Sequence, residues 1–86
     1  MTLVKQIQDA VAGKKAVIGV RSAIGEAKRG QVGTIIHASN LPVRLQQDLA
    51  RCAAAGIEVT PFGEDSQRLG QVCGKPFRIL AIGIRK

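Results

Sequence analysis

Helical hydrophobic patterns and short apolar runs follow one another four times along this chain, with a helical pattern first. Apolar residues at helical spacing cover residues 3–11, 21–29, 45–53 and 64–73, and apolar runs of strand length cover 16–20, 34–38, 57–62 and 77–84. Alternation of this kind predicts an α/β fold, in which helices cover both faces of a sheet.

The ends and positions of these elements are also indicated locally. Glycine follows the first three helical patterns, at Gly13, Gly30 and Gly56. Thr2 is a candidate cap for the first helix. The run 34–38 is apolar on both faces, which predicts a central strand, whereas the alternating run 57–62 contains Pro61, which predicts an edge strand.

The chain is strongly basic, with 13 Lys and Arg against 6 Asp and Glu, a net charge of +7 and a pI near 10.3. At 86 residues we expect one domain over residues 1–86. In a domain of this size such an excess usually indicates an anionic partner, most often nucleic acid. A surface that is merely basic, or one that binds a membrane, is the weaker alternative.

Cys52 and Cys73 lie 21 residues apart, without a Cys-x-x-Cys pair or companion histidines, so there is no zinc-site pattern. We expect two reduced thiols in the core rather than a disulfide. The first residues, Met-Thr-Leu-Val-Lys-Gln, lack the apolar run of a signal peptide, and no stretch is long enough to cross a membrane. These features predict a cytoplasmic protein without a metal or cofactor.

The sequence of residues 63–79 predicts a short helix, which leads through an exposed basic turn into the last strand. Phe77 begins that strand and is flanked by Lys75 and Arg78. It is one of only 2 aromatic residues in the chain, and the other, Phe62, is predicted to pack in the core. A ring at position 77 can stack on an unpaired base or begin a core strand, and stacking is our hypothesis.

Three motifs resemble one protein family. Gly30 to Pro42, Gly-Gln-Val-Gly-Thr-Ile-Ile-His-Ala-Ser-Asn-Leu-Pro, is similar to its pattern of glycine, spacer, apolar strand and Ala-x-Asn-x-Pro. Arg68 to Ile79 resembles its Leu-Gly-x-x-x-Gly-Lys-x-aromatic-Arg-Val stretch, and Gly19-Val-Arg-Ser22 resembles its Gly-x-Lys/Arg turn. Together they resemble the L-thirty-e family of ribosomal proteins, of the kink-turn RNA-binding superfamily, over about residues 15–84.

The resemblance implies a three-layer α/β/α sandwich with a mixed four-stranded sheet, in which the first and last strands are antiparallel. It implies an RNA-binding face formed by the turns after the first two strands and the loop before the last. The RNA-binding residues are then Gly19, Val20, Arg21, Ser22, Ser39, Asn40, Lys75, Pro76, Phe77 and Arg78. The implied protein is a ribosome-bound structural constituent of the large subunit. Its partners are ribosomal RNA and neighbouring ribosomal proteins, with no membrane and no small-molecule substrate.

The chain departs from the superfamily at two places. Kink-turn readers carry Gly-x-Asn-Glu-x-x-Lys at the second helix, where this chain has Arg21, Ser22 and Gly25 in place of the Asn, Glu and Lys. The family's Ile-Glu-Tyr-Tyr run in the third helix is absent, and Asp48 to Cys52 occupies its neighbourhood. The sequence therefore leaves open whether the RNA is a true kink-turn or another internal loop.

The implied site residues also have ordinary structural explanations. Gly19 and Arg21 can form a plain strand-to-helix turn, although the free N–H groups of such a turn favour phosphate. Ser39 and Asn40 can contact RNA or cap the helix that follows. His37 lies in an apolar strand and is predicted to be a packed core residue rather than a ligand.

The sequence offers little for catalysis. It has 1 histidine, no Gly-x-Gly-x-x-Gly, no Walker-type loop and no paired carboxylates near a nucleophile. We therefore predict an RNA-binding protein that is not an enzyme. Two alternatives stay open: a kink-turn-binding subunit of another ribonucleoprotein, such as a guide RNA or ribonuclease P particle, and a small nucleotide-binding regulatory domain.

Overall fold

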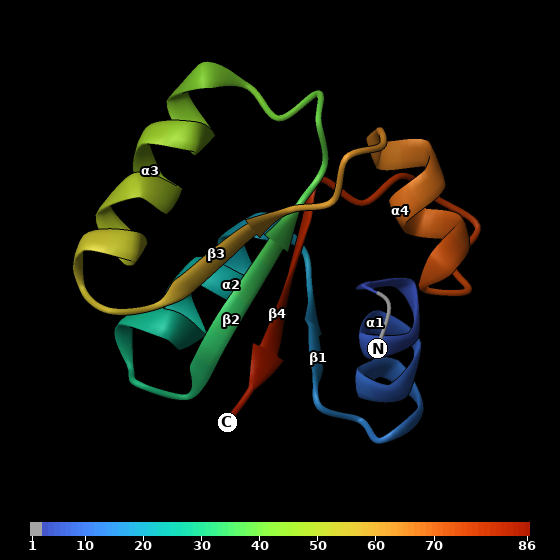
Figure 1. Ribbon diagram of the computed structural model, residues 1–86, viewed down its shortest axis with the longest axis horizontal. Helices are drawn as coiled ribbons and strands as arrows, with labels where there is room; N and C mark the ends of the chain where they lie inside the picture. Colours follow the sequence, from blue (N-terminus) through green and yellow to red (C-terminus); the bar gives the residue numbers. More distant parts are fainter. Residues whose placement is uncertain (1–2) are drawn as a thin grey trace.

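All the predicted helices and strands are present in the structure, a computed structural model that describes residues 3–86 (Figure 1). In chain order they are α1 (Leu3–Ala12), β1 (Ala16–Ile18), α2 (Val20–Lys28), β2 (Val32–His37), α3 (Val43–Ala54), β3 (Glu58–Pro61), α4 (Ser66–Val72) and β4 (Ala81–Arg85). The predicted cap Thr2 lies outside the described residues. No helix within residues 3–86 has the length and apolar character needed to span a bilayer.

The strands form one mixed sheet in the order β1-β4-β2-β3. β4 pairs antiparallel with both β1 and β2, whereas β2 and β3 are parallel. The predicted mixed sheet with antiparallel first and last strands is confirmed. β2 lies inside the sheet and β3 at its edge, as the run apolar on both faces and Pro61 indicated.

Two helices cover each face of the sheet, which gives the predicted three-layer sandwich (Figure 1). α1 and α4 pack on one face, where Ile7 and Leu69 are fully buried against Ile82. α2 and α3 pack on the other face, around Ala23 and Leu49. Both faces are therefore closed mainly by small and aliphatic side chains. Burying one large aliphatic side chain contributes about 1.5–3 kcal/mol.

The first strand is shorter than predicted. It ends at Ile18, because Gly19 turns the backbone with φ 102° and Val20 already begins α2. The prediction of a strand through residue 20 was wrong because an apolar run does not distinguish the end of a strand from the first turn of a buried helix.

The last strand begins later than predicted, at Ala81 rather than at residue 77. The chain leaves α4 and first runs back along that helix: the N–H of Lys75 donates to the carbonyl of Gly70 (3.0 Å), and the N–H of Ile79 donates to the carbonyl of Ser66 (3.0 Å). Backbone groups that bond to α4 are not free to pair in the sheet. Residues 74–80 are therefore a loop.

Several single residues lie where the sequence suggested. Cys52 and Cys73 are buried free thiols, and burial raises the pKa of both. Phe62 packs in the core beside α4. His37, by contrast, was predicted to be packed in the core but is only half-buried in β2, where it lines a shallow groove and its Nδ1 lies 3.1 Å from the carbonyl oxygen of Ala38.

Candidate nucleic-acid interface

Connections between strands and helices meet at one edge of the sheet, which we call the loop edge and which comprises residues 19–22, 38–44, 62–66 and 74–80. The carboxyl ends of β1, β2 and β3 lie at this edge together with the amino end of β4, because β4 is antiparallel to its neighbours. In Figure 1 this edge of the sheet is the upper side of the molecule, and the loop 74–80 reaches it by rising along α4 from that helix's lower end. Every predicted RNA-binding residue lies within it.

Backbone hydrogen bonds join three of these connections at the start of β4. The carbonyl of Leu80 accepts from the N–H of Ala38 (2.7 Å), and the carbonyl of Ala81 accepts from the N–H of Gly19 (3.1 Å). The turns after β1 and β2 are thereby fixed to the segment that ends the loop 74–80. The juxtaposition that the resemblance implied is present in the backbone.

Asn40 joins the turn after β2 to the start of α4. Its Oδ1 accepts from the backbone N–H of Ser66 (2.9 Å), and its Nδ2 donates to the Ser66 hydroxyl (3.0 Å). Beside it, the N–H of Ser39 donates to the carbonyl of Glu64 (2.8 Å). The alternative in which either residue caps the next helix is wrong, because the N-cap residue of α3 is Pro42, with no side-chain cap bond.

The turn after β1 begins α2 without a side-chain cap. Its N-cap residue is Gly19, whose positive φ is readily adopted only by glycine. The first N–H groups of α2 have no partner within the helix, and with the helix dipole they favour an anion. Arg21 and Ser22 are exposed there, whereas Val20 is half-buried and packs against the core between α2 and α3.

The loop 74–80 lies close against α4. Gly70 is buried, and a side chain at that position would collide with the backbone carbonyl of Phe77. The Phe77 side chain is 55% exposed. A shallow groove of about 360 Å³ is lined by Gln67, Gln71, Lys75, Pro76, Phe77 and Arg78.

The predicted site residues thus form two groups. The turns after β1 and β2 are joined through the start of β4, whereas the groove along α4 is lined by Lys75–Arg78 and by none of the other predicted residues. A ligand that contacts both groups has to extend from the start of α2 across the start of β4 to α4.

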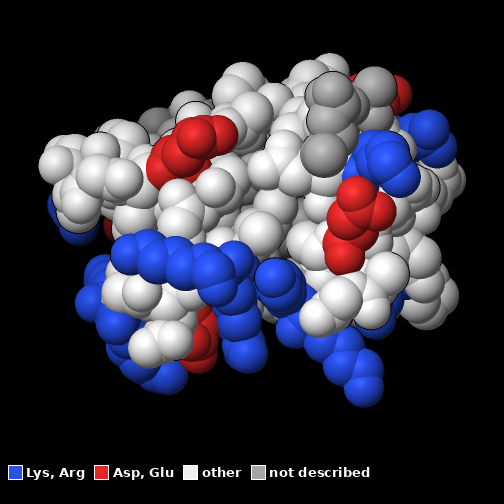
Figure 2. Space-filling view, turned by 60° about the horizontal axis from the view of Figure 1, so that its bottom comes forward, with Lys and Arg blue, Asp and Glu red and all other residues white. Residues whose placement is uncertain are grey.

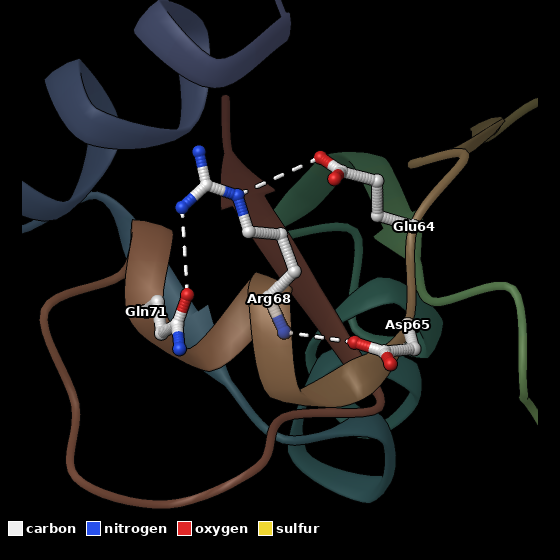
Figure 3. Close-up of polar contacts among 4 residues, drawn as sticks. All are labelled: Glu64, Asp65, Arg68 and Gln71. Carbon is white, nitrogen blue, oxygen red and sulfur yellow. Dashed lines mark hydrogen bonds and ion pairs between the residues drawn. The ribbon is translucent and has the colours of Figure 1, made fainter.

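α4 carries its own polar network, drawn in Figure 3. Asp65 caps the helix by accepting from the N–H of Arg68 (3.0 Å). The Arg68 guanidinium lies between the carboxylate of Glu64 (3.7 Å) and the amide oxygen of Gln71 (3.4 Å). Its charge is compensated locally. Within residues 3–86, the cations of the loop 74–80 have no such ion pair.

Two exposed residues at the start of α3 also lie at the loop edge, although they were not among the predicted site residues. Val43 is 68% exposed, and Arg44 beside it is exposed and has no ion pair within the described part of the chain. A cation in the first turn opposes the helix dipole, which suggests a role other than stability. An arginine two positions after the proline of the Asn-x-Pro pattern was the available signal.

Comparison with known proteins found a matching family and several similar relatives. Residues 1–86 match the ribosomal protein L7Ae/L30e/S12e/Gadd45 family. The large ribosomal subunit protein eL30 of Sulfurisphaera tokodaii is 38% identical over 71 residues, which cover 81% of this chain and 67% of the relative. The eL30 protein of Methanocaldococcus jannaschii is 34% identical over 83 residues, which cover 95% of this chain and 76% of the relative.

Two solved structures share the fold at low identity. A protein with unknown function from Bacillus halodurans has a TM-score of 0.86 and 21% identity, over 96% of this chain and 83% of that one. A Giardia lamblia 15.5kD RNA binding protein has a TM-score of 0.85 and 18% identity, over 98% of this chain and 71% of that one.

These two structures support the fold alone, whereas the family match and the eL30 relatives reach further. The family match and the eL30 relatives confirm the family that the three short motifs suggested. This chain belongs to the ribosomal protein L7Ae/L30e/S12e/Gadd45 family.

Proposed function

We propose that this protein is a non-catalytic constituent of the large ribosomal subunit that binds ribosomal RNA through its loop edge. The observation that carries the proposal is that curated relatives 34–38% identical over most of the chain are large ribosomal subunit proteins. It acts as one domain over residues 1–86, bound to ribosomes in the cytoplasm beside neighbouring ribosomal proteins.

The loop edge has the groups that RNA binding requires. Arg21, Arg44, Lys75 and Arg78 are exposed cations without ion pairs within residues 3–86, and each can contact a phosphate. Phe77 offers an exposed ring face for stacking on an unpaired base. Because hydrogen bonds already fix the turns after β1 and β2, less conformational freedom is lost on binding.

We further propose that the RNA element is an internal loop of the kink-turn type, read differently from the usual pattern. Arg21 and Ser22 occupy the first turn of α2 in place of an amide and a carboxylate. An arginine can donate two hydrogen bonds to the edge of a guanine. Gly25 adds no third polar side chain there.

The function is tested by sedimentation. Tagged protein is expected to travel with large subunits after a high-salt wash, and Arg21→Gln is expected to weaken that association. The matched control is Lys5→Gln, which removes the same charge from α1. Sedimentation with a small guide-RNA particle instead, or equal behaviour of both variants, contradicts the proposal.

The kink-turn detail is tested separately, with a kink-turn RNA and a copy whose sheared G·A pairs are replaced by Watson–Crick pairs. We expect the intact kink-turn to bind about tenfold more tightly, which corresponds to about 1.4 kcal/mol. Equal binding would reject the kink-turn and leave the ribosomal role standing.

A further inference from the structure

The opposite edge of the sheet, which we call the basic edge, has more cations than the loop edge. Among residues 3–86, seven of the 13 Lys and Arg lie there, at the turns that enter β1 and β2 and at the ends of α3 and β4: Lys14, Lys15, Lys28, Arg29, Arg51, Arg85 and Lys86. Figure 2 brings this side forward and shows Lys and Arg gathered along its lower part. Three carboxylates share the edge, on Glu26, Asp48 and Glu58, so a positive excess remains.

Backbone hydrogen bonds hold cations from separate segments beside one another. The N–H of Arg85 donates to the carbonyl of Lys15 (2.8 Å), and the N–H of Lys86 donates to the carbonyl of Gln31 (3.1 Å). The Lys86 side chain lies over Gly33, where an added β-carbon would be 3.2 Å from its Cγ. The sheet therefore determines the spacing of these charges.

Most of the basic edge is not neutralised by carboxylates. Arg29 pairs with Glu26 (3.1 Å), and Arg51 pairs with Asp48 (3.7 Å). Within residues 3–86 no ion pair involves Lys14, Lys15, Lys28, Arg85 or Lys86. A cluster of like charges of this kind favours a ligand that brings several negative charges at once.

The surface between these cations is concave. A groove of about 470 Å³ lies between α2, α3 and β2, and it is larger than the groove beside Phe77. Its walls are partly aliphatic, and its basic lining residues are Lys28, Arg51 and Lys86. A hollow flanked by cations lets a curved polyanion contact several of them together.

We propose that the basic edge binds the phosphate backbone of a second RNA segment, so that the protein holds two RNA segments on opposite edges of one sheet. The inference rests on the proposed function, because it takes the loop edge to hold the first segment. Nucleic acid fits better than an acidic protein: the exposed large apolar residues within 3–86, Val43 and Phe77, both lie at the loop edge. The large aliphatic residues that line the groove of the basic edge are buried or half-buried, so within residues 3–86 this edge exposes no large apolar side chain of the kind that anchors a protein interface.

Crosslinking tests the two edges independently. A photoreactive benzoylphenylalanine replaces either Gln31 at the basic edge or Gln67 beside the Phe77 groove, because both are exposed and neither carries charge. Each protein is bound to large ribosomal subunits from its own organism, and the crosslinked nucleotides are mapped. We expect the two positions to mark different RNA segments.

The outcomes separate the two proposals. RNA crosslinks from Gln67 with none from Gln31 overturn the second segment and leave the proposed function intact. Crosslinks from Gln31 alone support the basic edge and contradict the loop-edge site. If Gln31 crosslinks to protein neighbours and not to RNA, the inference is overturned in favour of an acidic protein partner.

A salt titration with purified large-subunit ribosomal RNA gives a second readout. The double variant Lys15→Gln with Lys28→Gln removes the same charge as Lys75→Gln with Arg78→Gln, so the two are matched. Each is expected to lower the log–log salt slope of binding by about two units, one for each lost phosphate contact. An unchanged slope in the Lys15 and Lys28 variant, with its unfolding curve like that of the parent, overturns the proposal.

Discussion

The two edges of the sheet differ in how their segments are held together. At the loop edge, segments far apart in the chain bond to one another, as Asn40 does to Ser66 and Gly19 to Ala81. At the basic edge, the three helix-to-strand connections are short turns that close locally, as where the N–H of Gly30 donates to the carbonyl of Ala27 (3.0 Å). The bonds there between distant segments, Arg85 to Lys15 and Lys86 to Gln31, are backbone bonds that continue the pairing of β4 with β1 and β2. Within residues 3–86, most cations of this edge have no ion pair.

The loop edge is thus characterised by its shape and the basic edge by its charge. Long-range hydrogen bonds and close packing give the loop edge a fixed form, which suits recognition of one RNA structure. Exposed cations on local turns give affinity that depends on salt and little on sequence. Substitutions that break the links or the close packing of the loop edge should therefore change stability and binding together, whereas neutralising a cation of the basic edge should change binding alone.

The largest effect is expected from Gly70→Ala. The new methyl group meets the backbone carbonyl of Phe77, so either the loop 74–80 or α4 has to move. We expect urea denaturation to show a loss of about 3 kcal/mol, the upper range for overpacking, because backbone cannot rotate away. Weaker RNA binding should accompany it.

The control is Gly25→Ala in α2, where nothing lies within 4 Å of the added carbon. Alanine there should raise the free energy of unfolding by about 0.5–1 kcal/mol through helix propensity. Equal losses in both variants would show that close packing of loop and helix is not what positions the loop edge.

Phe77→Ala tests whether the exposed ring binds RNA. Losing one stacked base should weaken binding by about 1–3 kcal/mol. Stability should fall by much less than the roughly 3–5 kcal/mol expected for the buried Phe62→Ala. Phe77→Tyr should retain most of the affinity. Normal RNA binding by Phe77→Ala together with easy unfolding would make the ring a structural residue.

Asn40→Ala tests the link between two loops. It removes both bonds to Ser66 and leaves a helix-start N–H of α4 without that partner, so we expect a loss of about 1–2 kcal/mol in urea denaturation. Ser39→Ala is the control, because Ser39 contributes its backbone N–H to the link, and it should change stability by less than about 0.5 kcal/mol. A neutral Asn40→Ala would mean that the loops are held by packing alone.

The smallest effect is expected at the basic edge, from Lys14→Gly. Lys14 has φ 58°, a left-handed conformation that costs less for glycine. We expect stability to rise by about 0.5–1 kcal/mol in denaturation while RNA binding weakens with the lost charge. If Lys14→Gly instead changes stability and RNA affinity in the same direction, the effect of charge on binding cannot be separated from the effect of backbone structure at this edge.

Much of the fold could be predicted from the sequence, because the period of apolar residues is a local property. The order of helices and strands, the interior position of β2 and the edge position of β3 all follow from runs of a few residues. The charge of +7 and three short motifs likewise indicated an anionic partner and the family.

Other features needed the folded chain. Residues 77–80 look like a strand locally, yet Ile79 bonds to Ser66, so competition between sheet and helix decided the outcome. Asn40 looks like a cap for the helix that follows it, yet its partner lies 26 positions away. Such choices depend on which backbone groups meet after folding.

The distribution of charge shows the same division. By itself the sequence determined how many cations there are and that they occur in pairs at Lys14-Lys15, Lys28-Arg29 and Arg85-Lys86. Only the tertiary structure placed these pairs on one edge and Arg21, Lys75 and Arg78 on the other. Strand direction is the physical reason: β4 runs antiparallel to β1 and β2, so its basic end lies beside their starts and its preceding loop lies beside their ends.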